Sequence, residues 1–260
     1  MNRYDSIKKI SDAILSGGLA EAVFLKGSIA RGEDDDYSDV DLYVVVAEEN
    51  FDAFLTRRIK YLEHYRPLIN WVEVNFVGPQ IVGIFDDALH FDLYAVKPDA
   101  IPQTGAMKVI HDPNDLLNNY QNEPLSLTDA ELTRWINNFT YLLTEIEAAY
   151  MRGDSLRLVT LFHHEYEVIS LLTRHIYDPA NSKLGNKSLF KVIPDELHQE
   201  LLSILELATP PDVLIAVKNL LKLFEKLFLQ LPCAVQAATN WQFYELMSSR
   251  IYAIENVMNK

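Results

Sequence analysis

Apolar residues change their spacing about half-way along the chain. In the first half they form short runs, either continuous or alternating with polar residues and bounded by turn residues, which is typical of β-strands. From Ser126 nearly to the end they recur every three or four residues, the period of α-helices that bury one face. The pattern predicts an α+β protein. We expect an N-terminal domain with a mixed β-sheet flanked by helices over residues 1–110, and an all-α helical bundle over residues 111–260.

The first half predicts two helices and several strands. Helix-spaced apolar positions over residues 3–16 end at Gly17-Gly18, and a second helix is expected over residues 50–66, ended by Pro67. Strands are expected at residues 22–27, 39–47, 71–77, 80–85 and 89–96, with 108–111 as a further candidate.

The second half predicts only helices and the loops between them. Ser126 to Asp129, with Glu131, has N-terminal capping chemistry for a helix that runs to about residue 151. A tight turn at residues 152–154 leads into a second helix, which ends near residue 177 and is followed by a loop. Shorter helices are expected around residues 194–207, 212–231 and 240–258.

Two aspartates stand where the strand 39–47 begins. Side chains alternate along a strand, so Asp39 and Asp41 share one face, with Cα atoms roughly 6.5–7 Å apart. Their oxygens can converge on a hard cation such as Mg²⁺, which is usually shared with substrate phosphates. Asp41 lies inside an apolar run, where an unpaired buried carboxylate would be costly, and a metal ion removes that cost. The alternative for Asp39 is a turn or cap role beside Ser38.

The residues before this pair suit a phosphate group. Gly27 leaves room for a phosphate to approach the backbone, and Ser28 offers a hydroxyl and an N–H group at the start of a helical turn. Arg31 lies between the serine and the aspartates and can meet a triphosphate, although a salt bridge to Glu33 or Asp34 is the alternative. The stretch therefore predicts a site for a metal ion and a nucleoside triphosphate.

These motifs resemble those of a known superfamily. Gly-Ser followed about ten residues later by Asp-x-Asp on a strand resembles the signature of the polymerase-β-type nucleotidyltransferases. Within it, GSIARGEDDDYSDVDLYVVV is most similar to the lincosamide and aminoglycoside adenylyltransferases. The resemblance covers roughly the first hundred residues. It implies Mg²⁺-dependent transfer of a nucleoside monophosphate, expected to be AMP from ATP, to a hydroxyl of a small acceptor with release of pyrophosphate.

The resemblance also implies roles for individual residues. The family has a third carboxylate on a later strand, and Asp92 in HFDLYAV fits that position. Asp39, Asp41 and Asp92 would then hold two Mg²⁺ ions, and Asp92 would complete the metal site or accept the proton of the acceptor. Gly27, Ser28 and Arg31 would bind the triphosphate of ATP or of another nucleoside triphosphate.

A second carboxylate is a candidate for the general base. In the resembling family a carboxylate from the helical domain can face the cleft, which makes Glu165 the alternative to Asp92. The other interpretation of Glu165 is a solvated helix face. The choice between the two carboxylates stays open at this point.

Composition narrows the partners. The formal net charge of −14 argues against nucleic acid and favours a cationic small acceptor such as an aminoglycoside or a lincosamide. No apolar run approaches the ~20 residues that cross a bilayer, and residues 3–16 do not resemble a signal peptide, so we expect a cytoplasmic protein without a membrane partner. The lone Cys233 excludes an internal disulfide and is expected to be a small buried residue.

Two other functions stay open. One is a nucleotidyltransferase that modifies a protein hydroxyl. The other is a non-catalytic, antitoxin-like nucleotide-binding protein of the same fold, against which the intact Asp39, Asp41 and Asp92 count. The sequence leaves the choice between a monomer and a homodimer open as well.

Overall fold

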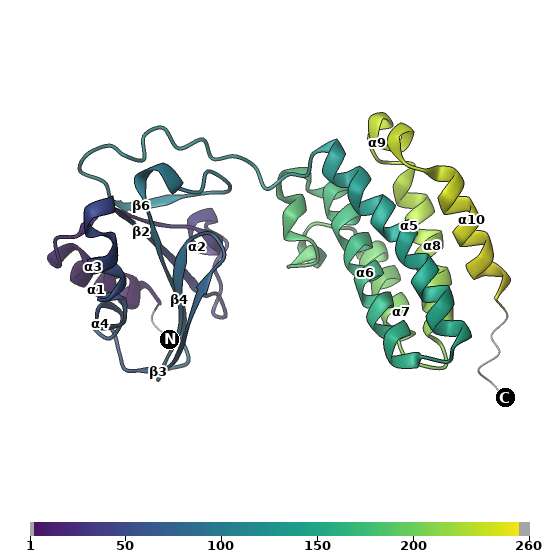
Figure 1. Ribbon diagram of the computed structural model, residues 1–260, viewed down its shortest axis with the longest axis horizontal. Helices are drawn as coiled ribbons and strands as arrows, with labels where there is room; N and C mark the ends of the chain where they lie inside the picture. The colour runs from purple at the N-terminus through teal and green to yellow at the C-terminus, as the bar shows by residue number, and fades with distance from the viewer. Residues whose placement is uncertain (1–2, 255–260) are drawn as a thin grey trace. The chain divides into compact units, whose positions relative to one another are not determined.

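The computed structural model describes residues 3–254, which belong to two compact units (Figure 1). Unit 1 is Met1–Pro124 and unit 2 is Leu125–Lys260. The units divide later than the sequence pattern suggests, because residues 111–124 stay with unit 1. Leu117 in that segment is 5% exposed and packs against the sheet of unit 1.

Unit 1 is built on a mixed β-sheet, as predicted. In the described part of this unit six strands follow the order β3-β4-β5-β2-β1-β6. β2 runs parallel to β5, and the other neighbouring pairs are antiparallel. The strands are β1 (Ala20–Leu25), β2 (Val40–Val46), β3 (Leu68–Asn75), β4 (Pro79–Phe85), β5 (His90–Val96) and β6 (Lys108–His111).

Helices cover one face of this sheet. Figure 1 shows α1, α3 and α4 gathered on one side of the strands. Their apolar side chains form one core with the alternate β2 residues Val40, Leu42, Val44 and Val46. These four residues share one face of β2, because side chains alternate along a strand. The helices and turns of unit 1 are α1 (Arg3–Ser16), α2 (Gly27–Arg31), α3 (Phe51–Leu55) and α4 (Arg58–Leu62), with 3-10 turns at Glu48–Asn50 and Pro98–Ala100.

The other face of the sheet carries a smaller core. Here Phe24, Tyr43 and Tyr94 pack with Leu117 and with partly buried residues such as Ile101 from the chain after β5. The segment that follows β5 therefore acts as the cover of this face. It leaves the beginning of β2 less fully covered, since Asp41 is only half-buried.

The helix predicted over residues 50–66 is broken in two. The Arg57 backbone N–H donates to the carbonyl oxygen of Phe54, three residues back, and the Thr56 hydroxyl donates to the carbonyl oxygen of Ala53 at 2.9 Å. Such local side-chain bonds compete with the α-helical ladder. The prediction of one continuous helix was wrong for this reason.

Unit 2 is helical throughout its described part. α5 begins with the predicted capping box, in which Thr128 and Glu131 exchange hydrogen bonds, and the Asp154 side chain caps α6. The end of the helix predicted over 240–258 lies partly outside the described residues. The helices are α5 (Asp129–Met151), α6 (Ser155–Tyr177), α7 (Asp195–Glu206), α8 (Val213–Phe228), α9 (Cys233–Ala238) and α10 (Trp241–Ala253), with 3-10 turns at Pro179–Leu184 and Leu189–Lys191.

Cys233 is exposed, so the expectation of a buried cysteine was wrong. It is the first residue of α9, a short helix that the sequence pattern did not reveal. Val235 is the buried residue of that helix, and Cys233 points its small side chain outward from the first turn.

No helix among residues 3–254 is long and apolar enough to cross a membrane.

Glu165 lies in the core of unit 2 rather than on a solvated face. Leu158, Glu165 and Leu172 recur two turns apart along α6, and all three are buried in the apolar seam of that helix. Within the described residues neither carboxylate oxygen of Glu165 has a hydrogen-bond partner. Burial raises the pKa of Glu165 well above its ordinary value.

The buried carboxyl group predicts a pH-dependent gain in stability for Glu165→Leu. A folded pKa above the unfolded value of about 4.3 costs stability as the pH rises through this range, so the gain should be small at pH 4 and about 2 kcal/mol at pH 8. Urea unfolding at the two pH values measures it. Glu167→Leu, at an exposed position of the same helix, is the matched control and should change stability by less than about 0.5 kcal/mol. Equal stability of Glu165→Leu and wild type at pH 8 would contradict the prediction.

Candidate functional site

Two of the predicted carboxylates face each other across neighbouring strands. Asp41 of β2 and Asp92 of β5 are Cα partners in the parallel pair. Partners in such a pair point to the same face, which here is the face away from α1, α3 and α4. Asp92 is 8% exposed and Asp41 is half-buried. Strand pairing therefore concentrates two negative charges at the beginning of two central strands.

Asp39 adds a third carboxylate to this end of the sheet. It precedes β2 directly, and the alternation of side chains places it on the side of Asp41. The pKa of Asp92 is raised mainly by burial and further by the charge of Asp39. Asp39 and Asp92 therefore lie close enough to interact electrostatically.

His90 is a close neighbour of Asp92. The two lie on the same face of β5, and His90 Nε2 is 3.0 Å from Asp92 Oδ1. This contact, like a hydrogen bond with Tyr94, favours the ionised carboxylate, but burial outweighs both and the pKa of Asp92 stays raised. Asp92 is therefore a carboxylate that accepts a proton more readily than an ordinary aspartate.

Two stacked tyrosines continue the same face behind the carboxylates. The rings of Tyr43 and Tyr94 lie 4.1 Å apart and 4° from parallel. Burial raises the pKa of each hydroxyl, and the Asp41 charge acts in the same direction, so both stay neutral. Sequence reasoning did not find this pair. The tripeptide Asp-Leu-Tyr occurs in both strands, at 41–43 and 92–94, and that repeat was the available signal.

Gly27 lies directly against the Asp41 carboxylate. A Cβ atom added to Gly27 would be 2.0 Å from Asp41 Oδ2, and the φ angle of Gly27 is +65°. Only glycine combines this left-handed conformation with so close an approach. The glycine also ends β1 earlier than expected, at Leu25, because its backbone leaves the extended region.

The remaining phosphate-binding candidates lie on α2. Ser28 follows Gly27 in the first turn and is half-buried. Arg31 ends the helix, and its Nε donates to Glu33 Oε2 at 2.7 Å. The salt bridge weighed as the alternative for Arg31 is thus present, and its role in binding a triphosphate stays a prediction.

Hydrogen bonds hold the acidic loop between α2 and β2 in place. Asp34 accepts hydrogen bonds from Arg3 at 3.0 Å and from Tyr4 at 2.8 Å, which ties the loop to α1. Asp35 accepts the backbone N–H of Tyr37 at 3.0 Å. These contacts hold the chain in place just before Asp39.

The carboxylates suit a hard divalent cation by their chemistry. Asp41 and Asp92 offer oxygen ligands on one face of the sheet, and Asp39 directly precedes β2. The raised pKa of Asp92 reflects burial and the nearby charge of Asp39, which a cation would relieve. Within residues 3–254, however, no three His, Cys, Asp or Glu side chains are already gathered closely enough to hold a metal ion. The residues therefore fit a cation that also takes ligands from a substrate phosphate, rather than a closed protein cage.

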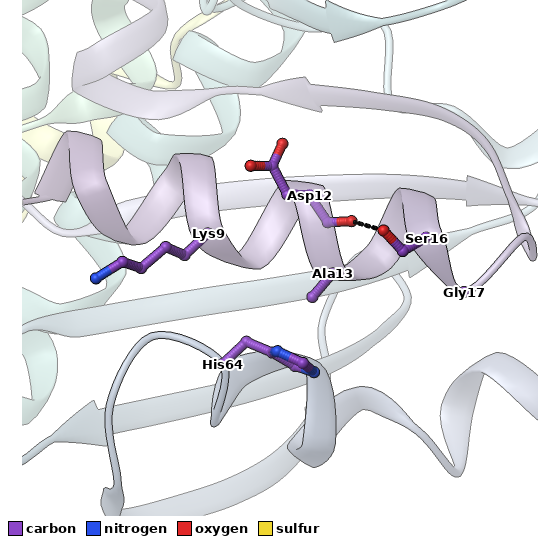
Figure 2. Close-up of a pocket in the computed structure, with 6 residues that line it drawn as sticks. All are labelled: Lys9, Asp12, Ala13, Ser16, Gly17 and His64. Atoms are coloured by element: carbon purple, nitrogen blue, oxygen red, sulfur yellow. Dashed lines mark hydrogen bonds between the residues drawn. The ribbon is translucent and has the colours of Figure 1, made fainter.

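A separate hollow in unit 1 is shown in Figure 2. It lies between α1 and the turn after α4, on the helical side of the sheet. It therefore does not include Asp39, Asp41 or Asp92. The hydrogen bond drawn in Figure 2 lies within α1: the Ser16 hydroxyl donates to the carbonyl oxygen of Asp12 at 2.7 Å. The hollow is lined by Lys9, Asp12, Ala13, Ser16, Gly17 and His64.

Comparison with protein families identifies the class. Residues 7–84 match the family model of the nucleotidyltransferase domain. The match includes Gly27, Ser28, Asp39 and Asp41 and ends before Asp92. The match identifies a nucleotidyltransferase domain at residues 7–84, within unit 1, and supports an enzyme of the nucleotidyltransferase class. The resemblance of the motif to nucleotidyltransferases is thereby confirmed for these residues.

Two solved structures are similar to this chain at low identity. One is an aminoglycoside 6-adenyltransferase from Bacillus subtilis, with 15% identity, a TM-score of 0.40, and coverage of 95% of this chain and 97% of that chain. The other is a spectinomycin adenyltransferase from Enterococcus faecialis with ATP and spectinomycin, with 13% identity, a TM-score of 0.36, and coverage of 96% and 99%. No curated protein gives a significant match.

The contact between Gly27 and Asp41 predicts different outcomes for two glycine variants. Gly27→Ala and Gly32→Ala both force alanine into a left-handed conformation, since Gly32 has a φ angle of +72°, and each should lose about 1–2 kcal/mol of stability. Only Gly27→Ala also drives a Cβ atom into the Asp41 carboxylate, because nothing lies within 4 Å of a Cβ at Gly32. Gly27→Ala should therefore lose nucleotidyl transfer, while Gly32→Ala keeps it.

Pyrophosphate release and urea unfolding, measured on both variants, provide the test. Equal transfer rates for the two variants would show that the close approach of the Asp41 carboxylate to Gly27 is not needed for activity.

Proposed function

We propose that the protein transfers a nucleoside monophosphate, AMP from ATP in the first instance, to a hydroxyl of a small cationic acceptor. Pyrophosphate is the other product. The observation that carries the proposal is the pairing of Asp41 with Asp92 beneath Gly27. It combines two paired carboxylates with a glycine whose missing side chain lets the Asp41 carboxylate approach the backbone, and Gly27 and Asp41 both lie in the residues that match the nucleotidyltransferase domain.

Asp39 and Asp41 would hold Mg²⁺, which supplies charge neutralisation of the triphosphate when bound. Asp92 would complete that ligand set or accept the proton of the acceptor hydroxyl. Both roles fit its position on β5, where it is the Cα partner of Asp41 and lies 3.0 Å from His90 Nε2. Gly27 and Ser28 would position the phosphates, and Arg31 would reach them by exchanging its partner Glu33.

The proposed acceptor class rests on charge. The chain carries a net charge of −14, and acidic residues concentrate between Glu33 and Asp41, beside the site. After Asp39 and Asp41 are engaged, the other carboxylates would still attract an ammonium group. An aminoglycoside is the first candidate and a lincosamide the second.

Loss of one carboxylate should abolish transfer without unfolding the protein. Asp41→Asn and Asp39→Asn each remove a charged oxygen ligand, and turnover should fall about 10³-fold, as is reasonable for a lost metal position. Asp36→Asn, in the exposed part of the same acidic loop, is the matched control and should turn over at the wild-type rate. Near-wild-type turnover of Asp41→Asn would rule out its assignment as a metal ligand.

The acceptor is identified by pyrophosphate release with a panel of aminoglycosides and lincosamides in the presence of Mg²⁺ and ATP. Attraction between exposed charges is screened over about 8 Å at physiological salt, so the acceptor KM should rise with added salt while kcat changes less. Labelling of proteins in a cell lysate by radioactive ATP, with no turnover of any panel member, would favour the protein-modifying alternative. ATP binding without any transfer would favour the non-catalytic one.

A further inference from the structure

Lys26 lies between the end of β1 and Gly27, at the edge of the candidate site. Its backbone N–H donates to the carbonyl oxygen of Asp41 at 3.1 Å. One residue therefore connects the end of β1 to the strand that carries Asp41 and directly precedes the glycine that faces the Asp41 carboxylate. A displacement of the Lys26 backbone would therefore also displace Gly27 and the backbone of Asp41.

The Lys26 ammonium is fully engaged by a different part of the chain. Nζ donates to the carbonyl oxygens of Pro102 at 3.1 Å and Thr104 at 2.5 Å, and to the Tyr120 hydroxyl at 2.9 Å. An ammonium group has three donors, and these contacts use all of them. The rings of Tyr120 and Tyr43 lie 5.2 and 6.0 Å from Nζ, within the range of cation–π attraction.

The acceptors of Lys26 belong to two segments that are bound to each other. The Gly105 backbone N–H donates to the carbonyl oxygen of Glu123 at 2.6 Å, and the Glu123 N–H donates to that of Gln103 at 2.8 Å. The Tyr120 hydroxyl also donates to the carbonyl oxygen of Thr104 at 3.1 Å. We call residues 102–105 with 120–123 the closure segment. Only an isolated bridge, Thr104 to Glu123, gives it sheet character.

Burying the Lys26 ammonium group costs desolvation free energy that an apolar side chain would not cost. Burial lowers the pKa of Lys26 to about 8, and the charge of Asp41 acts in the opposite direction. The side chain is still largely charged at neutral pH and donates its three hydrogen bonds. An apolar residue of similar length would pack against the same rings without desolvating a charge, but it would leave the three acceptors without this donor.

We propose that Lys26 is a positioning residue for nucleotidyl transfer, which clamps the closure segment to the end of β1 and so fixes Gly27 against the Asp41 carboxylate. The inference rests on the proposed function. Lys26 itself does not reach the reacting groups, because its donors are spent on the closure segment. Its effect passes through the backbone that it shares with Gly27 and Asp41.

Lys26→Met tests the clamp, with Lys97→Met as the matched control. Like Lys26, Lys97 lies over an aromatic ring, with Nζ 5.3 Å from the centre of the Phe51 ring. It directly follows β5, at the end of that strand away from Asp92, and forms a salt bridge with the exposed Glu48. Lys26→Met should lower kcat about 10²-fold, the order expected when reacting groups are slightly misplaced. Its affinity for Mg²⁺ with α,β-methylene-ATP, measured by calorimetry, should change by less than about threefold, since a retained Kd with a lowered kcat reports lost alignment. Lys97→Met should match the wild type in both.

Hydrogen exchange supplies a readout that does not depend on activity. The Gly105 and Glu123 amides should exchange faster in Lys26→Met, and those of the central strand β2 should not. Restoring the ammonium should restore kcat: Lys26→Cys in a Cys233→Ser background, aminoethylated at the introduced thiol, rebuilds a lysine-like side chain.

Each outcome decides between distinct ideas. An active wild type with an equally active Lys26→Met variant would overturn this inference and leave the proposed function intact. Unchanged exchange at Gly105 and Glu123 would overturn the clamp whatever the activity. A wild type that transfers no nucleotide to any acceptor would contradict the proposed function, and with it the role of Lys26 in transfer, even if exchange showed a clamp.

Discussion

The parallel pairing of β2 with β5 is the constraint on which the site depends. It aligns Asp41 with Asp92 and Tyr43 with Tyr94, so that the aspartate and tyrosine side chains of two copies of Asp-Leu-Tyr lie side by side on one face. The apolar residues between them, such as Leu42, are buried under the helices on the other face. A slip of one residue would turn the aspartates into that core, so the packing of the helices enforces the placement of the carboxylates.

This arrangement holds charge where burial disfavours it. The buried Asp92 has a raised pKa, and Gly27 adopts a left-handed conformation against a carboxylate, features that cost stability and persist when the surrounding fold determines them. Glu165 shows a similar burial of an acid in unit 2, but without any hydrogen-bond partner in the described part of the chain. The acids of unit 1 have a proposed role, in binding a cation and a triphosphate, whereas Glu165 lies in an apolar seam.

Sequence patterns predicted the structural features that depend on residues close together in the chain. Alternation placed Asp41 on the face opposite Val40 and Leu42, and capping chemistry located the start of α5. The alignment of Asp92 with Asp41 is a long-range pairing, which the motif resemblance suggested but spacing alone could not establish. The ion pair of Arg31, the exposure of Cys233 and the break in the helix before Pro67 depend on neighbours or on small competing hydrogen bonds. Their outcomes could not be read from periodicity.

The aspartates at the start of β2 are proposed to share a divalent cation with a nucleoside triphosphate. Anomalous diffraction from crystals grown with Mn²⁺ and α,β-methylene-ATP tests this proposal. We expect a manganese peak at about 2.2 Å from carboxylate oxygens of Asp39 and Asp41, with triphosphate oxygens among its other ligands and the phosphates close to Gly27. Nucleotide bound elsewhere on the protein, or a triphosphate at Gly27 whose metal ion does not contact Asp41, would contradict it.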